Sequence, residues 1–139
     1  MFHIGGDSVI KATWFLLLAA FSTLLSGCIF FAASSEFYIA NQSDYSIRAE
    51  WETIDGSSSS LALSAGERQK LGERTMIETN KVLPSDVYSK IDIYVLEKTL
   101  WALKYSQSPI NNDKWSERQK DGSADYIFDL IISNSDIGM

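Results

Sequence analysis

The chain has 139 residues, a formal net charge of −6 at pH 7, one histidine and one cysteine. This length corresponds to one domain of ordinary size. An acidic chain without a Lys/Arg cluster is a poor candidate for binding nucleic acid or anionic lipid headgroups. A single cysteine also excludes an intramolecular disulfide framework.

The first apolar run extends from Trp14 to Leu25. A transmembrane helix needs about 20 consecutive apolar residues, whereas the apolar region of a secretory signal peptide has about 7–15. A buried helix would place apolar residues at i, i+3 and i+4 beside a polar face, and this run has no such face. The run therefore predicts a signal helix.

The residues that end this run, Leu25-Ser26-Gly27-Cys28, resemble the lipobox of bacterial lipoproteins. The small residues before the cysteine also fit the subsites of a signal peptidase. The resemblance implies cleavage between Gly27 and Cys28, a diacylglycerol on the Cys28 thiol and acylation of the new amino group. The alternative is that Cys28 is a structural free cysteine.

Cleavage at this position removes residues 1–27 as a lipoprotein signal peptide. The segment before the apolar run departs from the usual positive excess, because Lys11 is offset by Asp7, and the mature chain keeps a net charge of −6. Two or three acyl chains anchor a protein stably. The sequence therefore predicts membrane attachment through acyl chains on Cys28.

The mature chain would contain no imidazole and no free thiol, because His3 lies in the signal peptide and Cys28 is lipidated. Zinc, copper and non-haem iron sites depend on those ligands and are nearly excluded. Ser-His-Asp and Cys-His mechanisms are excluded outright. Carboxylate chemistry or a Ser-Lys dyad remains, but no carboxylate pair has a spacing that marks an acid/base couple. We expect no metal, no cofactor and no enzymatic activity.

Residues 28–35 predict a lipidated tether, and residues 36–139 predict a β domain. Two strands are expected around a turn at residues 41–44, whose Asn, Ser and Asp side chains favour turns. The second strand alternates apolar and polar residues, as expected when one face is buried; its apolar positions are Tyr45, Ile47, Ala49 and Trp51. The Gly/Ser-rich segment 53–60 predicts a loop.

The second half predicts further short strands, at residues 61–63, 68–77, 91–96, 99–105, 115–120 and 124–133. Gly66 marks a turn and Gly72 a bulge. Pro84 argues against a central strand, and one helical turn is expected after Ser85. Glu97-Lys98 and Asp121-Gly122 are expected to form hairpin turns.

No segment shows sustained helical periodicity. Seven or eight short strands, spaced at intervals of roughly ten residues, predict a β-sandwich of antiparallel strands. Trp51, Trp101 and Phe128 are expected to pack inward, and we expect a monomer.

Four segments together resemble small Bacteroidales-type envelope lipoproteins: "FYIANQSDYSI", "PSDVYSKIDIYV", "YSQSPINNDKW" and "YIFDLIISNSDI". The resemblance implies an immunoglobulin-like sandwich and brings no catalytic residues. It also implies an outer-membrane location. Surface-exposed relatives carry an acidic run directly after the lipidated cysteine, but here residues 29–35 are uncharged, which favours the periplasmic side.

The loop from Ser108 to Trp115 is the candidate binding loop, formed by Asn111, Asn112, Asp113 and Trp115. An aromatic ring beside amides and a carboxylate can hold a sugar. The alternative is that Trp115 begins a strand and packs inward, while the polar residues only turn the chain.

Two function classes remain after these exclusions. The first is a non-catalytic binding or accessory module, with an envelope protein or a glycan as its partner. The second is a structural envelope component without a specific ligand. A carboxylate-based enzyme is a distant third.

Overall fold

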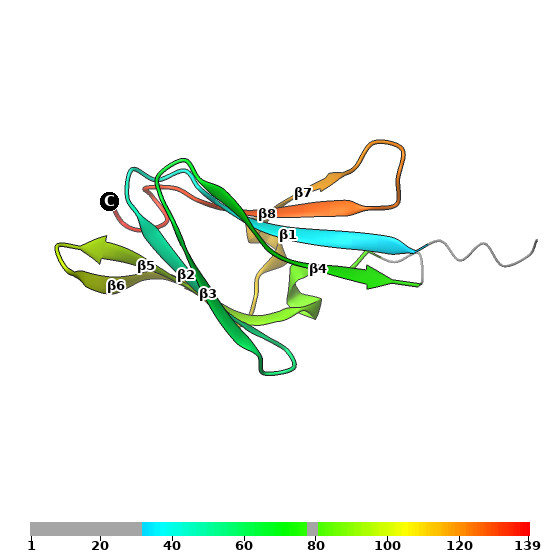
Figure 1. Ribbon diagram of the computed structural model, residues 1–139, viewed down its shortest axis with the longest axis horizontal. Helices are drawn as coiled ribbons and strands as arrows, with labels where there is room; N and C mark the ends of the chain where they lie inside the picture. The colour runs from blue at the N-terminus through cyan, green and yellow to red at the C-terminus, as the bar shows by residue number, and fades with distance from the viewer. Residues whose placement is uncertain (1–31, 78–80) are drawn as a thin grey trace, which may run out of the picture. The chain divides into compact units, whose positions relative to one another are not determined.

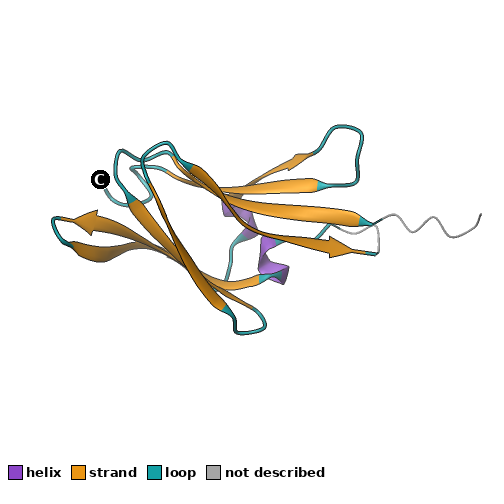
Figure 2. Ribbon diagram, viewed as in Figure 1, coloured by secondary structure: helices purple, strands orange, loops and turns teal. Residues whose placement is uncertain are grey.

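The computed structural model describes residues 32–77 and 81–139, and this part of the chain is all-β, as predicted. Eight strands and two short 3₁₀ helices follow one another along the chain (Figures 1 and 2). Their bounds are β1 (Ala33–Asn41), β2 (Ile47–Thr53), β3 (Ser58–Leu63), β4 (Arg68–Met76), η1 (Pro84–Asp86), β5 (Tyr88–Glu97), β6 (Leu100–Gln107), η2 (Asn112–Lys114), β7 (Trp115–Gln119) and β8 (Tyr126–Ile132). None of the described helices is long and apolar enough to cross a membrane.

The strands form two four-stranded sheets that pack as a β-sandwich. The β1 sheet has the order β4-β1-β8-β7, and the β2 sheet has the order β3-β2-β5-β6. The prediction that all strands are antiparallel is wrong at one pair, because β1 and β8 run parallel. Parallel neighbours need a long connection, and here the rest of the domain supplies it.

The core lies between the two sheets and follows the period-two pattern of the strands. Phe128 on β8 is 2% exposed and stacks on Phe37 of β1, with ring centroids 5.6 Å apart. The inward prediction for Phe128 is therefore confirmed. Trp51 is only partly buried against this core, because it lies near the end of β2.

The structure differs from the predicted boundaries at two places. β3 already begins at Ser58, inside the expected loop 53–60, and it pairs only with β2. Its exposed serines are tolerated because an edge strand has one partner and needs no apolar side chain there. β1 begins at Ala33, inside the expected tether 28–35, and the hydroxyl of the buried Ser35 accepts a hydrogen bond from the Val82 amide (3.1 Å).

The predicted β1–β2 turn and the predicted bulge in β4 are confirmed by hydrogen bonds and by strand register. Asn41 is buried and holds the β1–β2 turn, since its Nδ2 donates to the Tyr45 carbonyl (2.7 Å) and its Oδ1 accepts from the Ser43 hydroxyl (2.7 Å). Opposite Gly72 the register of β1 and β4 shifts, as expected of a bulge. One helical turn is present in this segment, as η1, but it begins at Pro84 and not after Ser85 as predicted.

Candidate functional site

The candidate binding loop is largely bonded to its own chain. The Oδ1 of Asn111 accepts from the Asp113 amide (3.0 Å) and caps η2. The Asn112 side chain donates to the Ser85 hydroxyl (2.8 Å) and accepts from the Ser85 amide (3.0 Å), which ties η2 to η1. The loop therefore uses both amides to fix its own conformation and exposes Asp113.

Trp115 does not face the surface of this loop. It is 6% exposed and stacks on Tyr88, with a centroid distance of 6.2 Å and an interplanar angle of 5°. Its ring also meets Phe37 edge to face at 6.3 Å. The inward alternative for Trp115 is confirmed, so the ring is not available to stack on a sugar. Cys28 and Gly27 lie outside the described residues.

The outer face of the β1 sheet carries side chains that pair with one another. Glu36 on β1 accepts from Lys120 (3.0 Å) and lies 3.4 Å from Lys70. The hydrogen bond from Lys120 is the main reason why the pKa of Glu36 is below its ordinary value of 4.5. On the same face, Arg68 bonds to Asp129 (2.6 Å) and stacks over the Tyr38 ring at 3.5 Å. This face is a solvated network of paired charges.

The outer face of the β2 sheet is different, because apolar side chains gather at the β5–β6 hairpin. Tyr94 of β5 pairs with Arg48 of β2 on one side and with Leu103 of β6 on the other. We call this set the hairpin surface, and it consists of Arg48, Tyr94, Leu96, Trp101 and Leu103. Its leucines are well exposed, with Leu96 at 42% and Leu103 at 52%.

The inward prediction for Trp101 is wrong. Trp101 pairs with Leu96, whose side chain alternates with the buried Val95 and therefore points outward. A register shift at Lys104 inserts one extra residue into β6. Odd-numbered residues of β6 before Lys104 therefore point to the outer face, whereas Tyr105 after it points inward. A bulge has this effect because it places two residues of one strand opposite one residue of its partner.

Arg48 lies at the centre of the hairpin surface. Its guanidinium carbon is 5.0 Å from the Tyr94 ring centroid and 5.1 Å from that of Trp101. Its Nη2 lies 2.9 Å from a carboxylate oxygen of Glu50. Its Nε is buried and has no hydrogen-bond partner among the described residues. Contacts between a guanidinium and aromatic faces are attractive, and here they hold the two rings and the arginine together.

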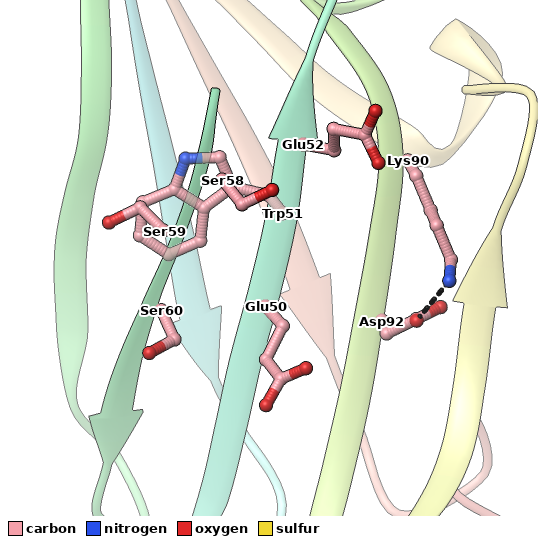
Figure 3. A pocket seen from close by; sticks show the side chains of 8 residues that line it. All are labelled: Glu50, Trp51, Glu52, Ser58, Ser59, Ser60, Lys90 and Asp92. Carbon is pink, nitrogen blue, oxygen red and sulfur yellow. Dashed lines mark ion pairs between the residues drawn. The ribbon is translucent and has the colours of Figure 1, made fainter. Parts of the chain in front are cut away.

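A polar groove of about 390 Å³ adjoins this surface on the same sheet (Figure 3). Glu50 and Asp92 are cross-strand neighbours within it, and each lies two residues from the Arg48–Tyr94 pair. Lys90 contacts Asp92 at 2.7 Å, and this hydrogen bond raises the pKa of Lys90. The lining residues are Glu50, Trp51, Glu52, Ser58, Ser59, Ser60, Lys90 and Asp92.

Asp92, the buried carboxylate of the groove, is fully paired within the chain. Asp92 is buried, and both of its oxygens are bonded, one by Lys90 and the other by the Ser106 hydroxyl (2.6 Å). A general base must be free to accept a proton from a substrate. The described residues also contain no group of three or more His, Cys, Asp or Glu side chains that could hold a metal ion.

Sequence reasoning missed the hairpin surface, although one signal for it was present. The segment from Leu96 to Leu103 places four large apolar side chains around a charged turn, which is more than one buried face of a hairpin can use. A surplus of this kind leaves some of them exposed.

In comparisons with known proteins, the chain matches no family model, no curated protein and no solved structure.

Proposed function

We propose that this chain is a lipid-anchored protein of the bacterial envelope that acts as a non-catalytic binding module. The lipobox-like residues ending at Cys28 support the anchor. The resemblance of four segments to small Bacteroidales-type envelope lipoproteins supports the outer membrane, and the uncharged residues 29–35 support its periplasmic side. β1 begins at Ala33, five residues after Cys28 in the sequence.

The observation that carries the binding role is the contrast between the two outer faces. On the β1 sheet, charged side chains pair with each other and leave a polar surface. On the β2 sheet, Leu96 and Leu103 are 42% and 52% exposed around Arg48, Tyr94 and Trp101. Exposed apolar patches rimmed by polar residues mark interaction sites on soluble domains.

A protein is the partner that this surface fits best. Trp, Tyr and Arg are the residue types most enriched among side chains that dominate binding between proteins, and all three meet here. The nearby charges are already paired within the chain, Arg48 with Glu50 and Lys104 with Glu97. The surface therefore suits an apolar, nearly neutral partner rather than a charged polymer.

The hairpin surface lies at the end of the domain that is far from the start of β1. The Leu96 amide donates to the Ser46 carbonyl (3.4 Å) in the β1–β2 turn, so the hairpin lies at the end of the domain where β1 finishes. Figure 1 shows the β5–β6 hairpin at the end of the domain opposite the start of β1. A partner can therefore contact this surface without covering the start of β1.

The immunoglobulin-like type remains part of the proposal. Two four-stranded sheets support a sandwich. They agree with an immunoglobulin-like fold in having two packed sheets. The parallel β1–β8 pair adds a feature beyond an all-antiparallel arrangement.

The test is a pull-down of the full-length lipoprotein from its own envelope, with quantitative mass spectrometry of what co-purifies. We expect the exposed Leu103→Ser change to remove the specific partner. Arg118→Ser, on the outer side of the β1 sheet, should leave the partner in place and serves as the matched control. If both variants retain the same proteins, the hairpin surface does not bind them. A wild-type protein that recovers no specific protein would favour the structural-component alternative.

A further inference from the structure

Two consecutive apolar side chains are exposed where β4 ends. Met76, the last residue of β4, is 49% exposed, and the following Ile77 is 70% exposed. A single exposed apolar side chain needs no explanation, whereas exposed apolar side chains that gather together mark protein or membrane contacts. These two residues lie outside the hairpin surface, which is formed by β2, β5 and β6. They therefore need an explanation of their own.

Met76 lies beside the first residue of β1. It is paired with Ala33 in the register of β1 and β4, and paired residues of antiparallel strands have Cα atoms about 5 Å apart. Ala33 follows Cys28 by five residues, which span at most about 18 Å in any conformation of the chain. The backbone of Met76 is therefore held within about 23 Å of the proposed site of acylation.

The sequence that connects the proposed anchor to β1 is apolar. Its residues are Ile29, Phe30, Phe31 and Ala32. Large apolar side chains are those by which interfacial segments enter the headgroup region of a bilayer. A connector of this composition favours a separation between the bilayer and Ala33 that is shorter than the fully extended length.

Basic side chains accompany Met76 at this end of β4. Met76 lines a groove of about 450 Å³ together with Arg74 and Lys81. Arg74 is exposed, and the Nζ of Lys81 lies 2.8 Å from a carboxylate oxygen of Glu117. Arginine and lysine side chains lay their aliphatic stems along apolar surroundings while their charged ends stay in the polar phase. Apolar and basic side chains in this combination suit a membrane–water interface.

We propose that Met76 and Ile77 enter the interface of the bilayer that holds the acyl chains of Cys28. This inference rests on the proposed lipid anchor and adds a second membrane contact, made by the domain itself. The tether makes this contact intramolecular, so two side chains contribute although they would bind a membrane weakly on their own. The contact relies on apolar burial and not on anionic headgroups, which an acidic chain repels. It leaves the hairpin surface free, because the β5–β6 hairpin lies at the other end of the domain (Figure 1).

Fluorescence quenching by labelled lipids tests this inference on the full-length lipoprotein. The variants are Met76→Cys and Ile77→Cys, with Gln69→Cys on the same strand and Leu103→Cys on the hairpin surface as controls. The sulfur of an acylated Cys28 is a thioether, so a thiol-reactive fluorophore labels only the introduced cysteine. Each labelled protein is reconstituted into phosphatidylcholine vesicles with and without a lipid that carries a nitroxide just below its headgroup. The circular dichroism spectrum of each variant shows whether the fold is retained.

Membrane contact predicts that the nitroxide lipid quenches the probes at Met76 and Ile77 about fivefold more than the probe at Gln69, which lies about 20 Å farther along β4. Equal quenching at Ile77 and Gln69 would overturn the inference and leave the lipid anchor intact. A probe at Ile77 that is shielded from aqueous iodide but not quenched by the nitroxide lipid would also overturn it, because protein would then cover this position. The strongest quenching at Leu103 would overturn it and contradict the hairpin surface as a protein-binding site.

The mass of each labelled chain separates a failure of this inference from a failure of the anchor. A fluorophore on Cys28 would show that its thiol is free and would contradict the lipid anchor, and this inference with it. An acylated chain that carries one fluorophore and is quenched at Met76 and Ile77, but not at Gln69, would support both.

Discussion

The guanidinium carbon of Arg48 on β2 lies 5.1 Å from the ring centroid of Trp101 on β6, although β5 separates the two strands. The Arg48 side chain lies over the ring of Tyr94 on β5, and its guanidinium carbon is 5.0 Å from the centroid of that ring. The three side chains therefore link three strands on the outer face. This arrangement orders the exposed hairpin before any partner arrives, which lowers the entropy lost on binding.

The anchor gives the first prediction. Cys28→Ala should abolish incorporation of labelled fatty acid and leave the signal peptide uncleaved, because the thiol is the proposed acceptor of the lipid. Fatty-acid labelling and the mass of the purified chain measure both effects. Normal membrane attachment of this variant would contradict the lipobox assignment.

The core gives the second prediction. Phe128→Ala should lower the free energy of unfolding by about 3–5 kcal/mol, as truncated core aromatics do. Trp51→Ala should cost less, because Trp51 is only partly buried at the edge of the core. Urea unfolding of a soluble chain that begins at residue 29 measures the two values, and we expect its circular dichroism to be β-rich. A larger cost for Trp51→Ala would contradict the packing described above.

The β4 bulge gives the third prediction. A Cβ added at Gly72 would lie 3.0 Å from the Tyr88 hydroxyl, which is buried and has no hydrogen-bond partner among the described residues. Gly72→Ala should therefore destabilise the domain by about 1–3 kcal/mol, as overpacking does. Tyr88→Phe removes the hydroxyl and should be neutral or stabilising.

The two changes form a double-mutant cycle that isolates this contact. In the Tyr88→Phe background, the cost of Gly72→Ala should fall by about 1 kcal/mol, because residues in contact couple. Denaturant unfolding of the four proteins gives the coupling energy. Equal costs in both backgrounds would show that the hydroxyl does not restrict position 72.

The pH dependence of stability gives the fourth prediction. The Lys120 hydrogen bond holds the pKa of Glu36 below its ordinary value of 4.5 in the folded state. Between the two pKa values the unfolded chain binds more protons, so the contribution of Glu36 is present above pH 4.5 and is lost as the pH falls through the lowered pKa. Glu36→Gln should therefore flatten the acid side of the stability curve, whereas Ser59→Ala at an exposed position of β3 should not. An unchanged acid limb in Glu36→Gln would contradict this contribution.

The sequence was sufficient to predict elements whose signal is local. Ile47 and Ala49 alternate with charged residues, and that pattern alone predicts a strand with one buried face. Gly122 has a φ of +71° in the turn predicted at Asp121-Gly122, a conformation that glycine adopts without steric cost. Asn41, placed in a predicted turn, indeed holds that turn.

The remaining features depend on contacts between distant residues. The parallel β1–β8 pair joins Ser35 to Tyr126, and no local pattern reports such a pairing. Ser58 belongs to a strand only because β2 offers it an edge. The sequence predicts the wrong face for Trp101 because residues 100–103 are all apolar, so an apolar/polar alternation cannot distinguish the two faces. The bulge at Lys104 also reverses which side chains of β6 point inward.

The most direct test of the binding function is the affinity of the purified lipoprotein for the protein recovered with it, measured for wild type, Leu103→Ser and Arg118→Ser. The account predicts that Leu103→Ser weakens binding at least tenfold, or about 1.4 kcal/mol, because it removes an exposed apolar side chain of the hairpin surface. Arg118→Ser should bind like wild type. Equal affinities for wild type and Leu103→Ser would contradict the assignment of the hairpin surface as the binding site.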